Sequence, residues 1–313
     1  MPRVWPILLA SLLTSACHTA RSKPAPSVES LLAQGRPFEA EVAMRASPHD
    51  PLAYGELVLG RDNLKEAELL ARTALRADPI NERAQLLLAR AQERHGEFEA
   101  AVPVFQKARD LVWLCRAALD ANQSPEVCKA LQGKTELEAV SAYTAWLLRA
   151  GQPQAAETEL RQALAHVHEA GPEIRTVSRL HYLLALALRD QHHPSEAEPE
   201  FWRTLAIQRE VLGGSLDIAD TLYALGAMKL DQGWPASFEP FLREALQIRV
   251  RLLDANDWRV AQARGAVAAC VSAERRVVAG AASDLRQAYE AVARARGKSS
   301  PEALQLQVWF NAS

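Results

Sequence analysis

The sequence feature that most constrains the fold is a repeat of small residues with a period of 34. Ala67 and Ala101 lie 34 positions apart, and so do Ala74 and Ala108. The same spacing separates three further pairs, which are Leu64 and Phe98, Gly55 and Ala89, and Asp62 and Gly96. A fixed period of this length is typical of stacked helical hairpins, in which small side chains stand where two helices cross. Because one hairpin cannot bury its apolar face alone, such units must stack into an extended array.

Three units of the chain resemble the tetratricopeptide repeat family. In the first unit, the residues on the family pattern are Tyr54, Gly55, Leu64, Ala67, Ala71, Ala74 and Pro79. In the second they are Leu88, Ala89, Gly96, Phe98, Ala101, Phe105 and Ala108. In the third they are Tyr143, Leu147, Gly151, Ala156, Leu160 and Ala163, with Pro153 at a position that is usually aromatic. The resemblance implies an all-α fold, a right-handed superhelical solenoid of antiparallel helix hairpins.

The C-terminal half continues the repeats with a longer period. Leu184 and Leu225, for example, are 41 positions apart. This half is similar to the longer repeats of the kinesin light chain type, in which the second helix and the loop after it are extended. A last, irregular unit is expected from Val260 to about Arg296, with Gly280 inside one of its helices.

The repeats and the N-terminus together predict four segments. Residues 1–16 are interpreted as a signal peptide, and residues 17–27 as a flexible tether. Residues 28–136 are expected to form N-terminal repeats that include a short irregular hairpin, and residues 137–313 to form C-terminal repeats. The outermost units are expected to be atypical, because one of their faces meets water.

The signal-like segment ends in a candidate lipidation site. An apolar stretch from Val4 to Leu13 follows Arg3 and is too short to span a membrane. The small residues before Cys17 resemble the lipobox of bacterial lipoproteins, which implies cleavage before this cysteine and its acylation. Several acyl chains hold a protein stably on a membrane. The resemblance therefore implies an outer-membrane lipoprotein of the cell envelope that faces the periplasm. The alternatives are an ordinary signal peptide of a soluble periplasmic protein, or a chance cysteine.

The remaining cysteines raise the question of a disulfide. Cys115 and Cys128 lie nearly symmetrically about a turn at residues 122–125, so they could face each other in an antiparallel hairpin. An exported protein meets an oxidising compartment, in which such a pair can be bridged. The equal alternative is two buried thiols that pack as small apolar residues. Cys270 is interpreted as a core thiol.

No motif in the sequence supports catalysis or metal binding. Gly297-Lys298-Ser299 matches the end of a phosphate-binding loop, but Val292 stands where that loop requires glycine. The histidines of the sequence lack further metal-ligating residues at the spacing that would complete a metal site. The net charge of −2 gives no case for nucleic acid. We therefore expect a protein that is not an enzyme, with no cofactor, metal or nucleic-acid partner. An active site assembled from distant residues is the alternative.

The resemblance instead implies a binding groove. In this family the first helix of each hairpin lines an inner concave surface, and the residues that fall there by register are Arg83, Leu86, Arg90, Arg94, Leu148, Arg149, Arg179, Tyr182 and Arg189. Arginine pairs with carboxylates and stacks on aromatic rings, so this set is expected to hold an extended acidic and apolar peptide. The alternative is ordinary surface arginine that pairs with helix neighbours.

Two functional classes remain open. The first is a lipid-anchored adaptor that binds a protein or peptide partner in the bacterial envelope and reaches the membrane through its N-terminal lipid. The second is a soluble regulatory scaffold without a lipid anchor.

Overall fold

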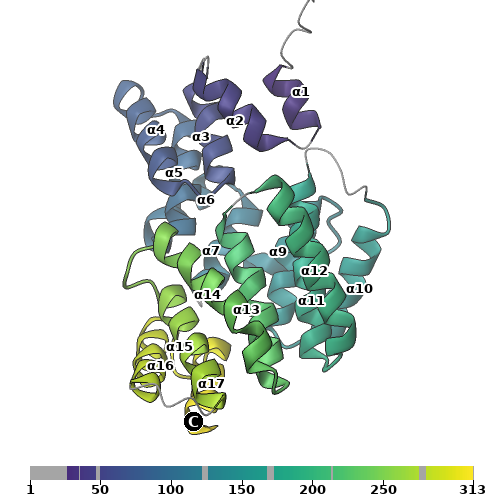
Figure 1. Ribbon diagram of the computed structural model, residues 1–313. Coiled ribbons are helices and arrows are strands. Elements are labelled where there is room, and N and C mark those ends of the chain that lie inside the picture. The colour runs from purple at the N-terminus through teal and green to yellow at the C-terminus, as the bar shows by residue number, and fades with distance from the viewer. Residues whose placement is uncertain are drawn as a thin grey trace, which may run out of the picture.

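The structure is a computed structural model that describes residues 27–34, 36–46, 50–121, 126–167, 173–212, 214–274 and 280–312. Within these ranges every regular element is a helix, and the described helices number 17 (Figure 1). They are α1 (Val28–Ala33), α2 (Pro37–Ala46), α3 (Pro51–Gly60), α4 (Leu64–Ala77), α5 (Glu82–His95), α6 (Phe98–Ala108), α7 (Leu111–Asp120), α8 (Glu126–Lys129), α9 (Leu137–Arg149), α10 (Pro153–Leu164), α11 (Ile174–Asp190), α12 (Pro194–Val211), α13 (Leu216–Asp231), α14 (Pro235–Leu252), α15 (Trp258–Ala273), α16 (Ala281–Arg296) and α17 (Pro301–Ala312). The expected signal peptide and Cys17 lie outside the described residues.

Successive helices pack as antiparallel hairpins, and the turn inside each hairpin explains part of the repeat. The turn residues Asp62, Gly96, Gly151, His192 and Gly233 all have positive φ, between 59° and 94°. Glycine adopts this left-handed conformation without steric cost, and aspartate tolerates it better than most residues. The repeated pair Asp62 and Gly96 therefore marks the same left-handed turn in two successive hairpins.

Small residues allow the two helices of each hairpin to approach closely. Ala67, Ala101 and Ala156 are fully buried, with 0% of their surface exposed. At Gly265 an added Cβ would lie 2.8 Å from the Cβ of Ala288, so α15 and α16 touch where neither side chain can grow. The architecture is thus the all-helical stack of hairpins that the alanine period predicts.

The first helices of the hairpins pack against one another along most of the stack. Contacts join α3 to α5, α7 to α9, α9 to α11, α11 to α13, α13 to α15 and α15 to α17. The second helices, α4, α6, α10, α12, α14 and α16, pack outside them (Figure 1). The stack curves far enough that its distant parts meet. One example is Arg259 of α15, whose Nη2 donates to the carbonyl oxygen of Arg94 in α5 at 3.1 Å.

The structure corrects the expectation for Gly280 and adds a helix at the C-terminal end. Gly280 does not lie inside a helix, because it precedes α16 with a φ of 99°. Helix α17 then packs against α15 and α16, with Leu306 fully buried. Trp309 Nε1 donates to Asp231 Oδ1 at 2.7 Å, which ties α17 to α13.

The short irregular hairpin is α7 and α8. Cys115 and Cys128 form a disulfide between these two helices, with their Cα atoms 5.0 Å apart. Cys270 is buried in α15. Among the described residues, we find no helix that is both long and apolar enough to cross a bilayer.

Candidate functional site

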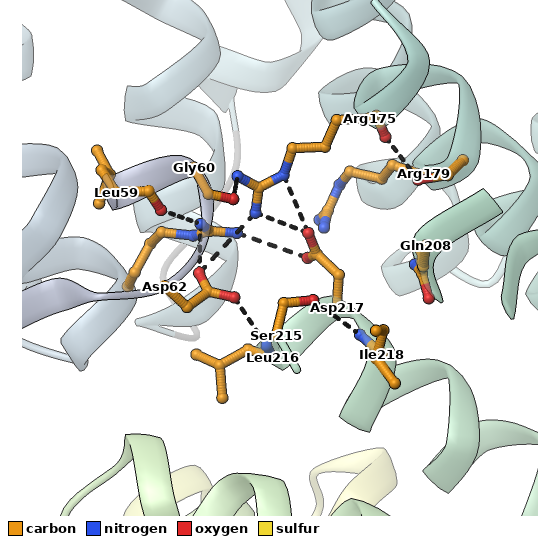
Figure 2. A network of polar contacts seen from close by, with 12 residues as sticks. Leu59, Gly60, Asp62, Arg175, Arg179, Gln208, Ser215, Leu216, Asp217 and Ile218 are labelled. Atoms are coloured by element: carbon orange, nitrogen blue, oxygen red, sulfur yellow. Dashed lines mark hydrogen bonds and ion pairs between the residues drawn. The ribbon is translucent and has the colours of Figure 1, made fainter. Parts of the chain in front are cut away.

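A buried ionic network joins the first hairpins to α13. Asp62, in the turn between α3 and α4, is only 1% exposed, and its Oδ2 accepts a hydrogen bond from the backbone N–H of Leu216 at 2.7 Å (Figure 2). Its other carboxylate oxygen pairs with Arg94 of α5. Arg94 also faces Asp217 of α13, with Nη2 and Oδ1 3.5 Å apart. The network therefore connects residues from three parts of the chain that are far apart in sequence.

Arg175 adds a fourth part of the chain to this network. It comes from α11 and donates to Asp217 Oδ2 from Nη2 at 2.7 Å and from Nε at 3.1 Å. It also donates to the carbonyl oxygen of Gly60 at the end of α3. Figure 2 shows Arg175 and Arg179 extending from α11 toward Asp217. Because Asp62 is buried and Asp217 is largely shielded from water, each carboxylate depends on the arginines for its charge compensation.

Burial and arginine contacts act in opposite directions on the two carboxyl groups. Burial raises the pKa of Asp62, against the attraction of Arg94 and Arg175. Burial also acts to raise the pKa of Asp217, but Arg175 and Arg94 overcome it and hold that pKa well below its usual value. Asp217 is consequently ionised at neutral pH and supplies a negative charge to the network.

A pocket of about 180 Å³ lies beside this network. Its walls come from the inner helices α3, α5, α7, α9, α11 and α13. They include five arginines, which are Arg90, Arg94, Arg116, Arg175 and Arg179. They also include three acidic residues, which are Glu56, Glu138 and Asp217. The pocket is therefore strongly polar and rich in cations.

Trp113 gives this pocket its aromatic wall. The guanidinium carbon of Arg116 lies 4.3 Å from the Trp113 ring centroid, and that of Arg90 lies 5.3 Å from it. On its core side the Trp113 ring stacks on Phe105, with 5.9 Å between centroids. Cation–π contacts of this kind hold arginine side chains in place while leaving their N–H groups available for a ligand.

Two of the five arginines have no carboxylate within ion-pair distance among the described residues. Within the part of the chain that the structure describes, neither Arg116 nor Arg179 forms an ion pair, although Arg179 Nε donates to Ser141 Oγ at 3.1 Å. Burial, followed by repulsion from Arg179, lowers the pKa of Arg116 to about 10. Nε of Arg90 is a buried donor that has no acceptor among the described residues. The pocket therefore presents more cationic donors than it has anionic acceptors.

The structure brings together only some of the arginines that the sequence placed in one groove. Arg90, Arg94 and Arg179 line this pocket. Arg83 lies half exposed and pairs with Glu56 and Asp50, at 2.9 and 2.7 Å.

The other groove candidates also lie outside the pocket. Arg149 Nη1 pairs with Glu302 of α17 at 2.7 Å, and Arg189 pairs with its neighbour Asp190 at 2.8 Å. The apolar candidates Leu86, Leu148 and Tyr182 are partly buried and pack against the hydrophobic core. The expected set does not form one continuous groove, because contacts from α13, α15 and α17 cross the inner surface.

Comparison with known proteins supports the repeat architecture. Residues 183–217 match the family model described as tetratricopeptide repeat, and this segment covers the end of α11, all of α12 and the start of α13. One unit of the stack is therefore similar to a tetratricopeptide repeat. No curated protein matches it at a significant level.

Two solved structures are similar to this chain. One is BtubC (BKLC) from P. vanneervenii, with 19% identity, a TM-score of 0.40, and coverage of 80% of this chain and 90% of that one. The other is a Rap protein complexed with Competence and Sporulation Factor, with 14% identity, a TM-score of 0.50, and coverage of 85% of this chain and 78% of that one. At this identity the second likeness concerns the fold alone.

Sequence reasoning missed several residues of the arginine-rich pocket. Trp113 and Arg116 belong to α7, whose hairpin is too short to align with a full repeat and therefore has no register from which to read an inner face. The sequence does contain a signal for Arg175, because this residue lies four positions before Arg179 and therefore shares its helix face. Asp62 enters the sequence analysis only as a residue 34 positions before Gly96, and nothing in the period indicates that its carboxylate is buried.

Proposed function

We propose that this protein is a scaffold that binds a segment of a partner protein on its inner helices, with the arginine-rich pocket as the anchoring point. The single observation that supports this proposal most strongly is the pair Arg116 and Arg179, two neighbouring guanidinium groups with no carboxylate within ion-pair distance among the described residues. Both side chains are partly buried in the pocket wall, where two like charges close together attract an anionic ligand. The repeat fold is typically an interaction scaffold, which agrees with this reading.

The size of the pocket limits what enters it. At about 180 Å³ it is smaller than the 300–1,000 Å³ common for drug-sized ligands. It therefore takes one side chain or one small group, and the remainder of the partner segment lies over the rim. The half-exposed cluster of Arg83, Glu56 and Asp50 provides polar groups on the adjacent surface. Charged groups at such a rim steer association more than they add affinity.

We further propose that the protein acts at a membrane surface of the cell envelope, held by a lipid on Cys17. The support is the apolar N-terminal stretch and the small residues before this cysteine. Replacing Cys17 with serine is expected to move the protein from the membrane fraction to the soluble fraction. A wild-type protein that is already soluble favours the alternative, a regulatory scaffold without a lipid anchor.

Site-specific photo-cross-linking tests the binding proposal in cells. A photoreactive amino acid at Thr176, which lines the pocket, is expected to capture a partner that mass spectrometry then identifies. The matched control is the same amino acid at Lys107, which is exposed on the outer helix α6. Capture from position 107 but not from position 176 would place the binding surface on the outer helices and remove the proposal.

A further inference from the structure

We propose that the group which enters the pocket is a phosphate monoester, carried by a phosphorylated side chain of the partner protein. This inference rests on the proposed function, since it names the chemistry of the segment that the inner helices bind. It comes from three observations on the pocket: its charge balance, its donors and its size.

Three of the five pocket arginines form ion pairs with carboxylates, and two do not. Arg90 is matched by Asp110, with Nη2 and Oδ2 3.1 Å apart. Arg94 is matched by Asp62, and Arg175 by Asp217. After these three pairs, Arg116 and Arg179 remain.

The other acids near the pocket compensate these two arginines only in part. Asp217 attracts Arg179 too, but it is shared with Arg175 and Arg94, which act on it more strongly. Glu56 is held by Arg83, with Oε2 2.9 Å from Nη2. Glu138 is solvent-exposed, so water screens its charge. Glu93 is buried on α5, and burial raises its pKa to about 7 although Arg116 acts to lower it, so at neutral pH it carries only part of a charge. A ligand with two negative charges therefore balances the pocket, whereas a single carboxylate leaves one cation uncompensated.

The donors of the pocket suit tetrahedral oxygens. Arg116 and Arg179 each offer a planar fork of N–H groups, which pairs with phosphate through two parallel hydrogen bonds. Nε of Arg90 supplies a further buried donor without an acceptor among the described residues. The Ser141 hydroxyl, which accepts from Arg179, has its own hydrogen to donate. A phosphate monoester has three terminal oxygens to accept these bonds and carries a charge of about −1.5 to −2 at pH 7.

The place of the pocket favours a protein segment over a lipid. The cavity of about 180 Å³ lies among the inner helices, and α11 and α13 supply part of its wall. A flat bilayer surface does not reach this position, whereas an extended segment that carries one modified side chain does. The volume is also too small for a nucleotide with its base and sugar.

Isothermal titration of the full-length protein with two blocked amino acids tests this inference. The probes are N-acetyl-O-phosphoserine amide and N-acetylglutamate amide, which differ mainly in the charge of their terminal group. The phosphorylated probe is expected to bind at least about tenfold more tightly. Equal affinity for both probes would overturn the phosphate assignment, and so would the absence of binding by the phosphorylated probe.

Variants then assign the binding to the pocket. Arg116→Gln and Arg179→Gln are each expected to weaken binding of the phosphorylated probe by about tenfold or more. Arg179→Lys keeps the charge but loses the fork, so an intermediate loss is expected. Arg286→Gln, an exposed arginine of α16, is the control and should bind as the wild type does. Circular dichroism and thermal melting verify that each variant is folded. Folded Gln variants that bind normally would contradict the assignment.

A phosphatase experiment separates this inference from the proposed function. The partner captured through position 176 is treated with phosphatase and tested again for binding. Loss of binding is the expected result. Unchanged binding would overturn the phosphate inference while leaving the scaffold function intact, whereas the absence of any capture at position 176 removes the scaffold function itself. Binding to phosphatidic acid vesicles but not to the phosphorylated probe would also overturn the inference.

Discussion

The Asp62 carboxylate accepts a hydrogen bond from the backbone N–H of Leu216, which lies 154 positions later in the chain, at 2.7 Å. This contact places a negative charge at the first turn of α13, where the helix dipole stabilises it. The same carboxylate pairs with Arg94, so one side chain holds two distant parts of the stack together. These contacts join the first hairpins to α13 beside the arginine-rich pocket.

Replacing Asp62 with asparagine is expected to destabilise the protein strongly. The amide keeps an acceptor for Leu216 but leaves the buried Arg94 without its nearest anion, and breaking one side of a buried pair costs roughly 3–5 kcal/mol. Urea unfolding measures the change, and Glu210→Gln on the exposed surface of α12 is the control, with an expected effect within about 0.5 kcal/mol. Equal stability of the two variants would show that this network does not hold the stack closed.

Glu93 is expected to make stability depend on pH. Its pKa is raised from 4.5 to about 7 in the folded protein, chiefly by burial. Between these values the folded state keeps the proton and the unfolded state loses it, so this contribution is full below pH 4.5 and declines as the pH rises to 7. At about 1.4 kcal/mol per pH unit, the loss is about 2–3 kcal/mol.

Unfolding of wild type and Glu93→Gln at several pH values isolates this effect. Glutamine does not ionise in either state. The stability of the variant should therefore increase relative to that of the wild type as the pH rises from 4.5 to 7. A constant difference between the two proteins over that range would show that Glu93 has an ordinary pKa.

Enlarging Ala101 tests the packing of the hairpins. Ala101 is fully buried with Phe105 and Ala117, so Ala101→Leu overpacks this contact and is expected to cost roughly 1–3 kcal/mol. Ala100→Leu, one position earlier and exposed on the same helix, is the matched control and should be nearly neutral. If both variants unfold at the same urea concentration, the alanine period does not mark a helix crossing.

Peptide mapping tests the disulfide between Cys115 and Cys128. Digestion without reductant is expected to yield the two cysteines in linked peptides, with Cys270 absent from them. The bridge spans a sequence separation of 13, and the chain-entropy model gives about 3 kcal/mol for such a loop. Cys128→Ser should therefore lower stability by about this amount under oxidising conditions. Alkylation of both thiols in native protein would exclude the bridge.

The sequence predicts contacts between neighbouring repeats far better than contacts between distant ones. The period that relates Asp62 to Gly96 identifies the hairpin, its turn and its buried alanines, because each depends on residues within one or two units. The bond from Leu216 to Asp62 depends on how far the whole stack curves, which is a sum of small rotations that no local pattern encodes. Arg94 was therefore placed in an open groove, although the curvature buries it against Asp217.

The repeat period also fails to predict residue positions in the irregular units. Trp113 and Arg116 lie in a hairpin that departs from both periods, so their inward position had no register to indicate it. The sequence does contain local features that predict α17, since Gly297 ends α16 and Pro301 stands at the first turn of the next helix. The spacing of the last, irregular unit predicts Gly280 inside a helix, whereas its φ of 99° places it in the left-handed conformation just before α16.

The measurement that most directly tests the central account is hydrogen–deuterium exchange of the full-length protein with and without its captured partner. If the partner binds at the pocket, exchange should slow at the inner helices α5, α7 and α11, which supply Arg94, Arg116 and Arg179. The outer helices α12 and α14 should exchange at unchanged rates. Protection confined to these outer helices, with α5, α7 and α11 unaffected, would contradict the account.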